Sequence, residues 1–146
     1  MDNKVSRPSG GKESLPALGK SDYQRLSHFR YRLRRFLRLS ENLCKKEGLT
    51  PLQYQLLLHV KGFPDRDWAT IGELAEFLQA QHHGVVALID RCEKLDLVTR
   101  RANGDDRRVV EIHLLPKGEK LLARLAAQHQ SELRLLREEF SLPGWK

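Results

Sequence analysis

Apolar residues recur at every third or fourth position in several stretches of the chain, and the longest of these begins near residue 21. This spacing is that of one face of an α-helix. Ser21, with Gln24 three residues later, has the form of a capping box at its start. We expect a helix from Ser21 to about residue 47, ended by Gly48. Such a helix of about 26 residues is roughly 39 Å long, so its apolar stripe indicates packing against a second copy of the chain.

Three shorter helices are predicted between residues 50 and 95. Thr50 and Thr70 each precede a Gln or Glu by three residues, which is the capping-box pattern. Pro51 stands at the first helical position, where proline is favoured. A short Gln-Ala-Gln break at 79–81 separates the second of these helices from the third. The third helix is expected to bury Val85, Leu88, Ile89, Cys92 and Leu95.

A β-hairpin is predicted after these helices. Its β-prone arms flank Asn103-Gly104, the dipeptide most typical of a tight hairpin turn. In the second arm the residues alternate between two faces. We expect the inward side chains to be Val110, Ile112 and Leu114 and the outward ones to be Glu111 and His113. Two helices joined by a tight turn and followed by a hairpin form a winged helix-turn-helix.

A last long helix is expected from Pro116 to about Phe140. The fold class is therefore mainly α with a small β-hairpin wing, and long helices at both ends serve as dimerisation helices. The expected parts are a disordered basic arm (1–20), an N-terminal dimerisation helix (21–48), a winged helix-turn-helix (49–115), and a C-terminal dimerisation helix and tail (116–146). The predicted dimer contacts are Leu26, Phe29, Leu33, Phe36, Leu125, Leu133 and Leu136.

The net positive charge of the chain predicts an anionic partner. The 146 residues contain 26 Lys and Arg against 19 Asp and Glu, and the isoelectric point is near 9.7, which favours nucleic acid or a membrane surface. No apolar run approaches the roughly 18 residues of a membrane span. The N-terminus lacks the apolar core of a signal peptide. Two cysteines suit a reducing compartment, so we expect a cytoplasmic protein without a membrane partner.

Catalytic and metal-binding patterns are missing from the sequence. The six histidines show no metal spacing on one helix, and no nucleophile with a matching base and no phosphate loop is visible. We therefore expect no enzyme activity, no metal and no cofactor.

Four short motifs follow one another along the second half of the chain: Ile71-Gly72-Glu73-Leu74-Ala75, Leu88 to Val98, Asp106-Arg107-Arg108, and Leu114-Leu115-Pro116-Lys117-Gly118. In this order and spacing they resemble motifs of the MarR (multiple antibiotic resistance regulator) family of bacterial transcription factors. The resemblance covers about residues 22–140. The chain departs from the family at Leu115, where a helix-capping Thr is usual, and at Asp96, where Gly is usual.

This resemblance implies a homodimer, held by its first and last helices, that places two winged helices in successive major grooves of an operator. The usual output in the family is repression released by a small aromatic or phenolic ligand, and some members sense oxidants through cysteine. It also implies a bacterial or archaeal protein associated with the nucleoid. The recognition helix would be the one that follows the 79–81 break.

Recognition helices read bases mainly with their N-terminal residues. Amide and imidazole groups can hydrogen-bond purine edges, and cations further along contact phosphates. Arg108 is the expected minor-groove contact, Asp106 would brace the wing, and Arg107 could do either. The full set of predicted DNA-binding residues is Gln81, His82, His83, Ala87, Arg91, Lys94, Arg100, Arg101, Asp106, Arg107 and Arg108.

Simpler interpretations stand beside these. Gln81 could only cap its helix, the histidines and Arg107 could only be solvated, and Cys44 could be a buried inert thiol rather than an oxidant sensor. Candidate ligand residues are Arg30, Arg34, Tyr54 and Trp68, with a solvated face and ordinary core packing as the alternatives. The rival functions are a winged-helix module for protein–protein contact, an oxidant-sensing regulator of the same fold, and a basic helical protein that binds RNA or a membrane.

Overall fold

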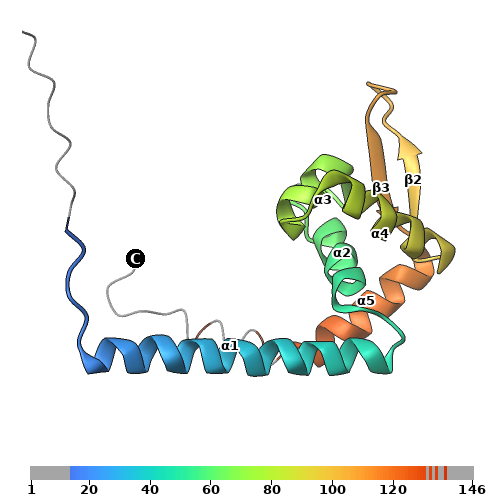
Figure 1. The fold of residues 1–146 in the computed structure, drawn as a ribbon. Helices are drawn as coiled ribbons and strands as arrows, with labels where there is room; N and C mark the ends of the chain where they lie inside the picture. Colours follow the sequence, from blue (N-terminus) through green and yellow to red (C-terminus); the bar gives the residue numbers. More distant parts are fainter. Residues whose placement is uncertain (1–13, 131, 133, 135–136, 138–146) are drawn as a thin grey trace, which may run out of the picture.

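The computed structural model describes residues 14–130, 132, 134 and 137. Figure 1 shows a long helix along one edge of the molecule and a lobe of helices and strands above one of its ends. The elements in chain order are α1 (Lys20–Lys46), α2 (Pro51–Lys61), β1 (Trp68–Thr70), α3 (Ile71–Leu78), α4 (His82–Lys94), β2 (Val98–Ala102), β3 (Val110–Leu114) and α5 (Pro116–Gln128).

Helix α1 begins at Lys20, one residue before the expected start, and Gly19 is its N-cap. The Gly19 backbone N–H donates to Asp22 Oδ2 at 3.0 Å. The predicted pairing of Ser21 with Gln24 is therefore wrong. The Asp22 carboxylate is the better capping group because it also lies in the first turn, where the helix dipole favours negative charge.

The other end of α1 agrees with the sequence. Gly48 has a left-handed φ of 75°, and its N–H donates to the Lys45 carbonyl at 3.1 Å. The Leu49 N–H donates to the Cys44 carbonyl at 3.0 Å. These two hydrogen bonds form a Schellman motif, which confirms Gly48 as the residue that ends the helix.

Both predicted capping boxes in the lobe are present. Thr50 Oγ1 accepts from the Gln53 N–H at 3.2 Å, and Gln53 Oε1 accepts from the Thr50 N–H at 3.0 Å. Thr70 and Glu73 make the same reciprocal pair at the start of α3. Each box satisfies two backbone donors that a helix start leaves unpaired, so the starts of α2 and α3 are set by local sequence.

The core lies inside the lobe, where α2, α3, α4 and α5 pack with the sheet. Leu95, expected on the buried face of α4, is instead its C-cap and is 39% exposed. Asp96 then takes a left-handed φ of 58°, and the chain turns so that Leu97 is buried in its place. Asp96 thus occupies the conformation that explains why the family prefers Gly there. The fully buried large side chains include Leu56, Leu57, Leu74, Ile89, Leu97, Ile112 and Leu125.

The sheet has three antiparallel strands in the order β1-β3-β2, with Ala69 opposite Ile112 and Arg100 opposite Ile112 on the other side. The sequence predicted only the β2–β3 hairpin, because β1 is three residues long and leads directly into a helix cap. β3 is the central strand. Glu111 and His113, expected to face outward, are largely covered, with side chains 14% and 20% exposed.

Helix α5 begins without a side-chain cap at Leu115, as predicted from the missing Thr, and ends at Gln128 with His129 as its C-cap. The predicted range to Phe140 is therefore interrupted at His129. Residues 130, 132, 134 and 137 are again helical. Leu133, Leu136, the end of the expected helix and residues 1–13 of the expected arm lie outside the described residues.

The C-terminal part of α1 is the part that packs against the lobe. Ser40 and Cys44 are its buried residues, and Ser40 Oγ lies 2.9 Å from Nε2 of buried His129. The N-terminal half of α1 runs beyond the lobe (Figure 1). Of the helices that the structure describes, none combines the length and apolar character required to cross a membrane.

Candidate nucleic-acid interface

Helix α4 has one buried and one open face, because its apolar residues follow the helical repeat. Val85, Leu88, Ile89 and Cys92 are buried. Gln81 is the N-cap but makes no side-chain capping hydrogen bond. The simple capping role for this residue is therefore wrong, and Gln81 is exposed. The exposed residues at and along α4 are Gln81, His82, His83, Gly84, Ala87, Asp90, Arg91 and Lys94, which include all six predicted for this helix.

Arg100 connects this helix to the wing. Its guanidinium lies 2.7 Å from Asp90 Oδ1 and also pairs with Glu93, both on α4. The side chain is only 29% exposed. Arg100 was predicted as a phosphate contact, but its charge is matched by two carboxylates. We therefore assign it to the junction of β2 with α4, while its neighbour Arg101 is exposed.

The wing tip is a seven-residue loop, 103–109, rather than the predicted tight Asn-Gly turn. Asn103 Oδ1 accepts from the backbone N–H groups of Asp105 at 2.9 Å and Asp106 at 3.0 Å. The left-handed backbone that a two-residue turn requires is absent at Gly104. An asparagine side chain that folds back onto the next residues is an Asx turn, so Asn103 organises the loop through its side chain.

Asp106 braces the wing, as the sequence predicted. Its Oδ1 accepts from the Arg108 backbone N–H at 3.0 Å and lies 3.3 Å from Arg108 Nε. The Arg108 side chain is nevertheless 92% exposed, and Arg107 beside it is exposed as well. The loop therefore holds two arginines outward at the far end of the sheet.

A polar chain supports the loop from the sheet. Asn103 Nδ2 donates to Glu111 Oε2 at 2.6 Å, and Glu111 Oε1 lies 2.8 Å from His113 Nε2. His113 stacks on Trp68 of β1, with ring centroids 6.1 Å apart. Sequence reasoning missed this support, although an Asn followed by Gly-Asp-Asp is a usable signal for an Asx turn.

The four predicted ligand residues do not form one site. Arg30 and Arg34 are exposed on α1, whereas Tyr54 is 4% exposed and stacks on His129 with centroids 4.5 Å apart. Burial raises the pKa of Tyr54 to about 12. Trp68 is engaged on the sheet and also contacts Arg66, whose guanidinium carbon lies 3.9 Å from its ring centroid. The aromatic residues are occupied in packing, which is why a shared pocket does not form.

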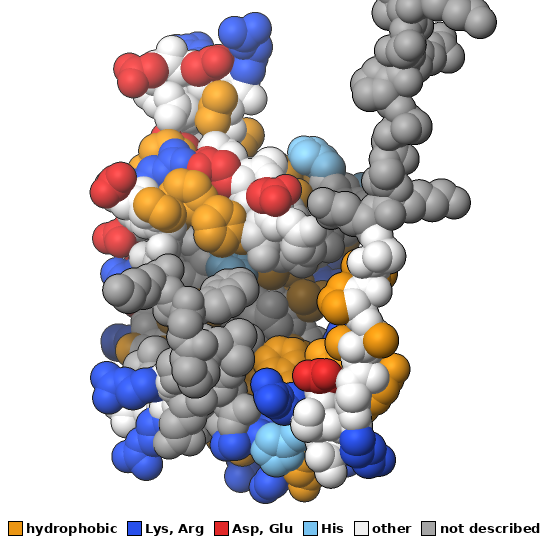
Figure 2. Space-filling model, turned by 90° about the vertical axis from the view of Figure 1, so that its left-hand side faces the viewer, with side chains coloured by type: hydrophobic (Ala, Val, Ile, Leu, Met, Phe, Trp, Pro, Cys, Tyr) orange, Lys and Arg blue, Asp and Glu red, His pale blue; other side chains and the backbone are white. Residues whose placement is uncertain are grey.

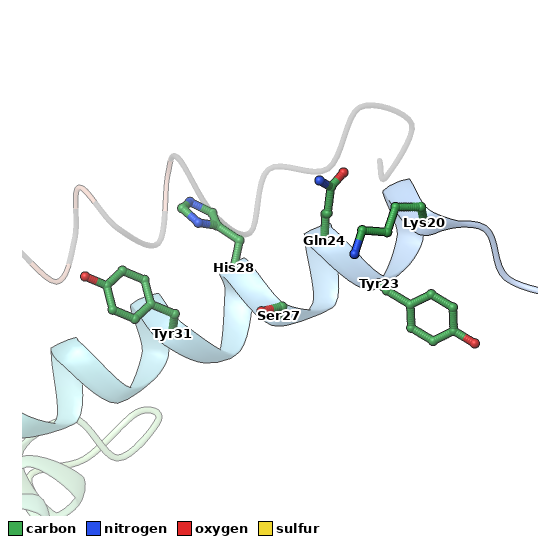
Figure 3. Close-up of a pocket in the computed structure, with 6 residues that line it drawn as sticks. All are labelled: Lys20, Tyr23, Gln24, Ser27, His28 and Tyr31. Atoms are coloured by element: carbon green, nitrogen blue, oxygen red, sulfur yellow. The ribbon is translucent and has the colours of Figure 1, made fainter.

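Figure 3 shows a pocket elsewhere, on the N-terminal half of α1. The described residues that line it all come from this helix, and they include Tyr23, His28 and Tyr31. His28 and Tyr31 lie side by side, with ring centroids 6.4 Å apart. None of the four predicted ligand residues lines this pocket.

Both cysteines are fully buried. Burial raises the pKa of the Cys44 thiol, with a smaller opposing effect from its hydrogen bond with Ser40, and raises that of Cys92 to about 11. The reactive thiolate is therefore scarce at neutral pH, which favours the inert alternative for Cys44. Within the part of the chain that the structure describes, no three His, Cys, Asp or Glu residues are grouped to hold a metal ion.

A model of the MarR family matches residues 47–109 of the chain. The chain is similar to the uncharacterized HTH-type transcriptional regulator YsmB of Bacillus subtilis strain 168, with 42% identity over 99 residues, 68% of this chain and 66% of that protein. It is also similar to the HTH-type transcriptional repressor MdtR of the same bacterium, with 31% identity over 99 residues. This alignment covers 65% of this chain and 62% of MdtR. The matched region thus spans slightly less than two thirds of either relative.

Solved structures agree on the fold. A MarR family protein from Bacillus stearothermophilus superposes with a TM-score of 0.69 at 25% identity, over 86% of each chain. A mutant of MepR from S. aureus, solved bound to an oligodeoxyribonucleotide, superposes with a TM-score of 0.62 at 20% identity, over 87% of each chain. The family match, the two relatives and this shared winged-helix fold lead to one conclusion: the chain belongs to the MarR family.

Proposed function

We propose that the chain is a homodimeric repressor that binds an inverted repeat in double-stranded DNA. The observation that carries this proposal is the open first turn of α4 beside a braced wing that holds Arg107 and Arg108 outward. The two features belong to one lobe and are joined through Arg100. A helix end and a basic finger at a set separation suit a major groove and its neighbouring minor groove.

Base recognition is assigned to the first turn of α4. Gln81, His82 and His83 are exposed, and their amide and imidazole groups can donate to or accept from purine edges. Ala87, one turn further along, offers a small apolar contact of the kind that fits a thymine methyl. Gly84 leaves open space around its backbone, so this turn can approach the groove floor closely.

Phosphate contacts are assigned to the exposed cations around this turn. Arg91 and Lys94 lie further along α4, and Arg101 lies on β2. Arg107 and Arg108 are assigned to the minor groove or its edges, where the negative potential is strongest. Arg100 is assigned a positioning role, because it neutralises two carboxylates that would otherwise repel the DNA.

Dimerisation is assigned to α1. Its projecting half exposes Leu26 by 55%, and Phe29, Leu33 and Phe36 lie on the same stripe, each half-buried. Stable homodimer interfaces commonly bury more than about 2,000 Å². A two-fold dimer meets the same base edges twice, so the operator is expected to be an inverted repeat with half-site centres roughly 10 base pairs apart.

Repression is the output proposed, in line with the named function of MdtR. Binding to an operator in the cytoplasm and nucleoid would block transcription. The most specific part of the proposal is that a small aromatic or anionic molecule releases the protein from its operator. It rests on the family resemblance, because the four residues first suggested for such a ligand lie apart.

The test is selection of DNA from a random pool with the purified chain, followed by footprinting. An inverted repeat is expected, with log affinity falling against log salt at a slope of about −4 to −8 for the dimer. Arg108→Ala is expected to weaken binding to operator and random DNA alike, whereas His83→Ala is expected to change the base preference. Protection of one asymmetric half-site with affinity nearly independent of salt would overturn the proposal.

A further inference from the structure

Positive charge is distributed unevenly along the chain. Helix α1 contains nine Lys or Arg and two Asp or Glu, a formal net charge of +7, which equals that of the whole chain. Residues 47–115, which contain the winged helix, have eight Lys or Arg against eleven Asp or Glu, a net charge of −3. The positive charge that favours an anionic partner therefore lies mainly outside the lobe assigned to operator binding.

Part of this charge forms a regular line on α1. Arg30, Arg34 and Arg38 follow one another at four-residue spacing, Lys45 continues the line, and all four are exposed. We call these four residues the α1 basic stripe. It extends over about 22 Å at 1.5 Å per residue. No ion pair joins any of the four to another described residue, although Glu41 stands nearby on the helix.

The stripe lies off the face of α1 that packs against the lobe. Each residue turns the helix by about 100°, which places the stripe roughly 100° around the helix from buried Ser40 and Cys44. Figure 2 shows Lys and Arg side chains gathered toward the lower end of the molecule, along which α1 runs in Figure 1. Acidic and basic side chains are mixed toward the upper end, where the wing lies. An anion on the stripe would therefore not compete with DNA at α4.

We propose that the α1 basic stripe binds the phosphate backbone of a second DNA duplex, so that one molecule bridges two duplexes. The first duplex is the operator of the proposed function, on which this inference rests, and the second is held without base readout. Arginine suits this task because its planar guanidinium binds phosphate oxygens in pairs. Double-stranded DNA offers one charge per about 1.7 Å of its axis, so a line of cations about 6 Å apart meets phosphates in many registers.

A membrane surface is the other polyanion to consider. A helix that lies on a bilayer inserts its apolar face and keeps its cations beside the headgroups. The apolar stripe of α1 at Phe29, Leu33 and Phe36 is half-buried and lies on the side that the proposed dimer uses. The other exposed apolar residues of α1, which include Tyr31, Leu37 and Leu39, are spread around the helix at about 100° per residue rather than gathered on one face beside the cations. This arrangement favours a duplex over a bilayer.

The experiment is a capture assay with the full chain. A biotinylated operator duplex is fixed to beads, protein is added, and capture of a fluorescent duplex of unrelated sequence is measured. The stripe variant is Arg30→Gln with Arg34→Gln and Arg38→Gln, since glutamine and arginine have similar helix propensity. It is expected to bind operator within about twofold of the parent, to capture at least about tenfold less second duplex, and to lower the salt slope of that capture by about 2.7.

Two matched variants separate position from charge. Lys46→Gln with Lys117→Gln and Lys120→Gln removes the same charge at exposed positions away from the stripe and is expected to leave capture unchanged. Replacing the three stripe arginines by lysine keeps the charge and is expected to retain most of the capture. Circular dichroism and sedimentation of each variant check the fold and assembly, and single Arg→Gln changes replace the triple variant if the latter fails to fold.

Each remaining outcome counts against one proposal. If the parent binds operator but captures no second duplex, or if the stripe variant captures it as well as the parent does, the bridging proposal is wrong. If the parent binds no operator, the proposed function and the bridging that rests on it both fail. The contact between the stripe and DNA is then judged separately, by whether the stripe variant loses affinity for unrelated DNA. Binding to phosphatidylserine vesicles without capture of DNA would assign the stripe to a membrane instead.

Discussion

Arg100 shows how a single side chain can set the geometry of the interface. It comes from the wing, and both of its partners, Asp90 and Glu93, come from α4. The three charges lie at the base of the hairpin, so they tie the wing to the recognition helix. Arg101, the next residue along the strand, is exposed and provides a natural comparison.

We expect Arg100→Gln to affect both stability and DNA affinity, and Arg101→Gln to affect DNA binding alone. Arg100→Gln leaves two carboxylates unpaired beside the DNA, so it should lower both thermal stability, by about 1 kcal/mol, and affinity for every sequence. Arg101→Gln should leave stability unchanged and reduce the salt slope by about 0.9. Thermal unfolding and fluorescence anisotropy measure the two effects. Equal stability of the variants would contradict the positioning role of Arg100.

Among the elements, the wing loop depends on Asn103 rather than on Gly104. The asparagine side chain makes hydrogen bonds to two backbone donors and to Glu111, and it thereby positions the segment that holds Arg108. A Cβ atom added at Gly104 would have no atom within 4 Å. The shape of the loop thus requires the Asn103 side chain but does not require a glycine at position 104.

We expect Asn103→Ala to loosen the loop and Gly104→Ala to be neutral. The first change removes the acceptor for the backbone N–H groups of Asp105 and Asp106, so hydrogen exchange there should become faster and DNA affinity should fall several-fold. The second should alter stability by less than about 0.5 kcal/mol. A loss of about 1 kcal/mol or more at Gly104 would instead favour the tight Asn-Gly turn.

The packing of α5 depends on a glycine in its first turn. A Cβ atom at Gly118 would lie 2.1 Å from the Leu97 carbonyl oxygen, whereas one at Gly72 in α3 would meet nothing within 4 Å. Gly118→Ala should therefore destabilise the protein by about 1–3 kcal/mol despite a gain in helix propensity. Gly72→Ala should stabilise it slightly. Urea unfolding of the two variants measures this, and similar midpoints would contradict the close approach of α5 to Leu97.

For the whole molecule, the projection of α1 beyond the lobe is the main feature. That half of the helix exposes Tyr23, Leu26 and Tyr31, while Leu125, first assigned to the dimer interface, is fully buried within its own chain. Leu125 belongs to the core cluster of the lobe, where it lies on the buried face of α5 with Leu121 and Leu122. The proposed dimer therefore depends on α1 more than the sequence indicated.

We expect Leu26→Glu to dissociate the dimer and Leu52→Glu to leave it intact. Leu26 and Leu52 are similarly exposed, at 55% and 51%, but Leu52 lies on α2 in the lobe. Charge placed in an apolar interface is costly to bury. Sedimentation at micromolar protein should give a species near 16.9 kDa for the first variant and twice that mass for the second. If the parent protein sediments only as the monomer, the homodimer in the proposed function is wrong.

The sequence by itself determined the features that depend on neighbours a few residues apart. The capping boxes at Thr50 and Thr70, the helix end at Gly48 and the buried stripe of α4 each involve residues within about one turn of helix, so their chemistry can be read directly from spacing. Asp106 and Arg108, two residues apart, belong to the same class. The family motifs also lie in these segments.

Only the tertiary structure decided the contacts between distant residues. Arg100 meets Asp90 ten residues away, and His129 meets Ser40 across 89 residues, while β1 exists because β3 lies beside it. The same packing used Tyr54 and Trp68 for support rather than for a ligand. A pattern along the chain reports which face of an element is apolar, but which element covers that face is set by how the complete chain buries its surface.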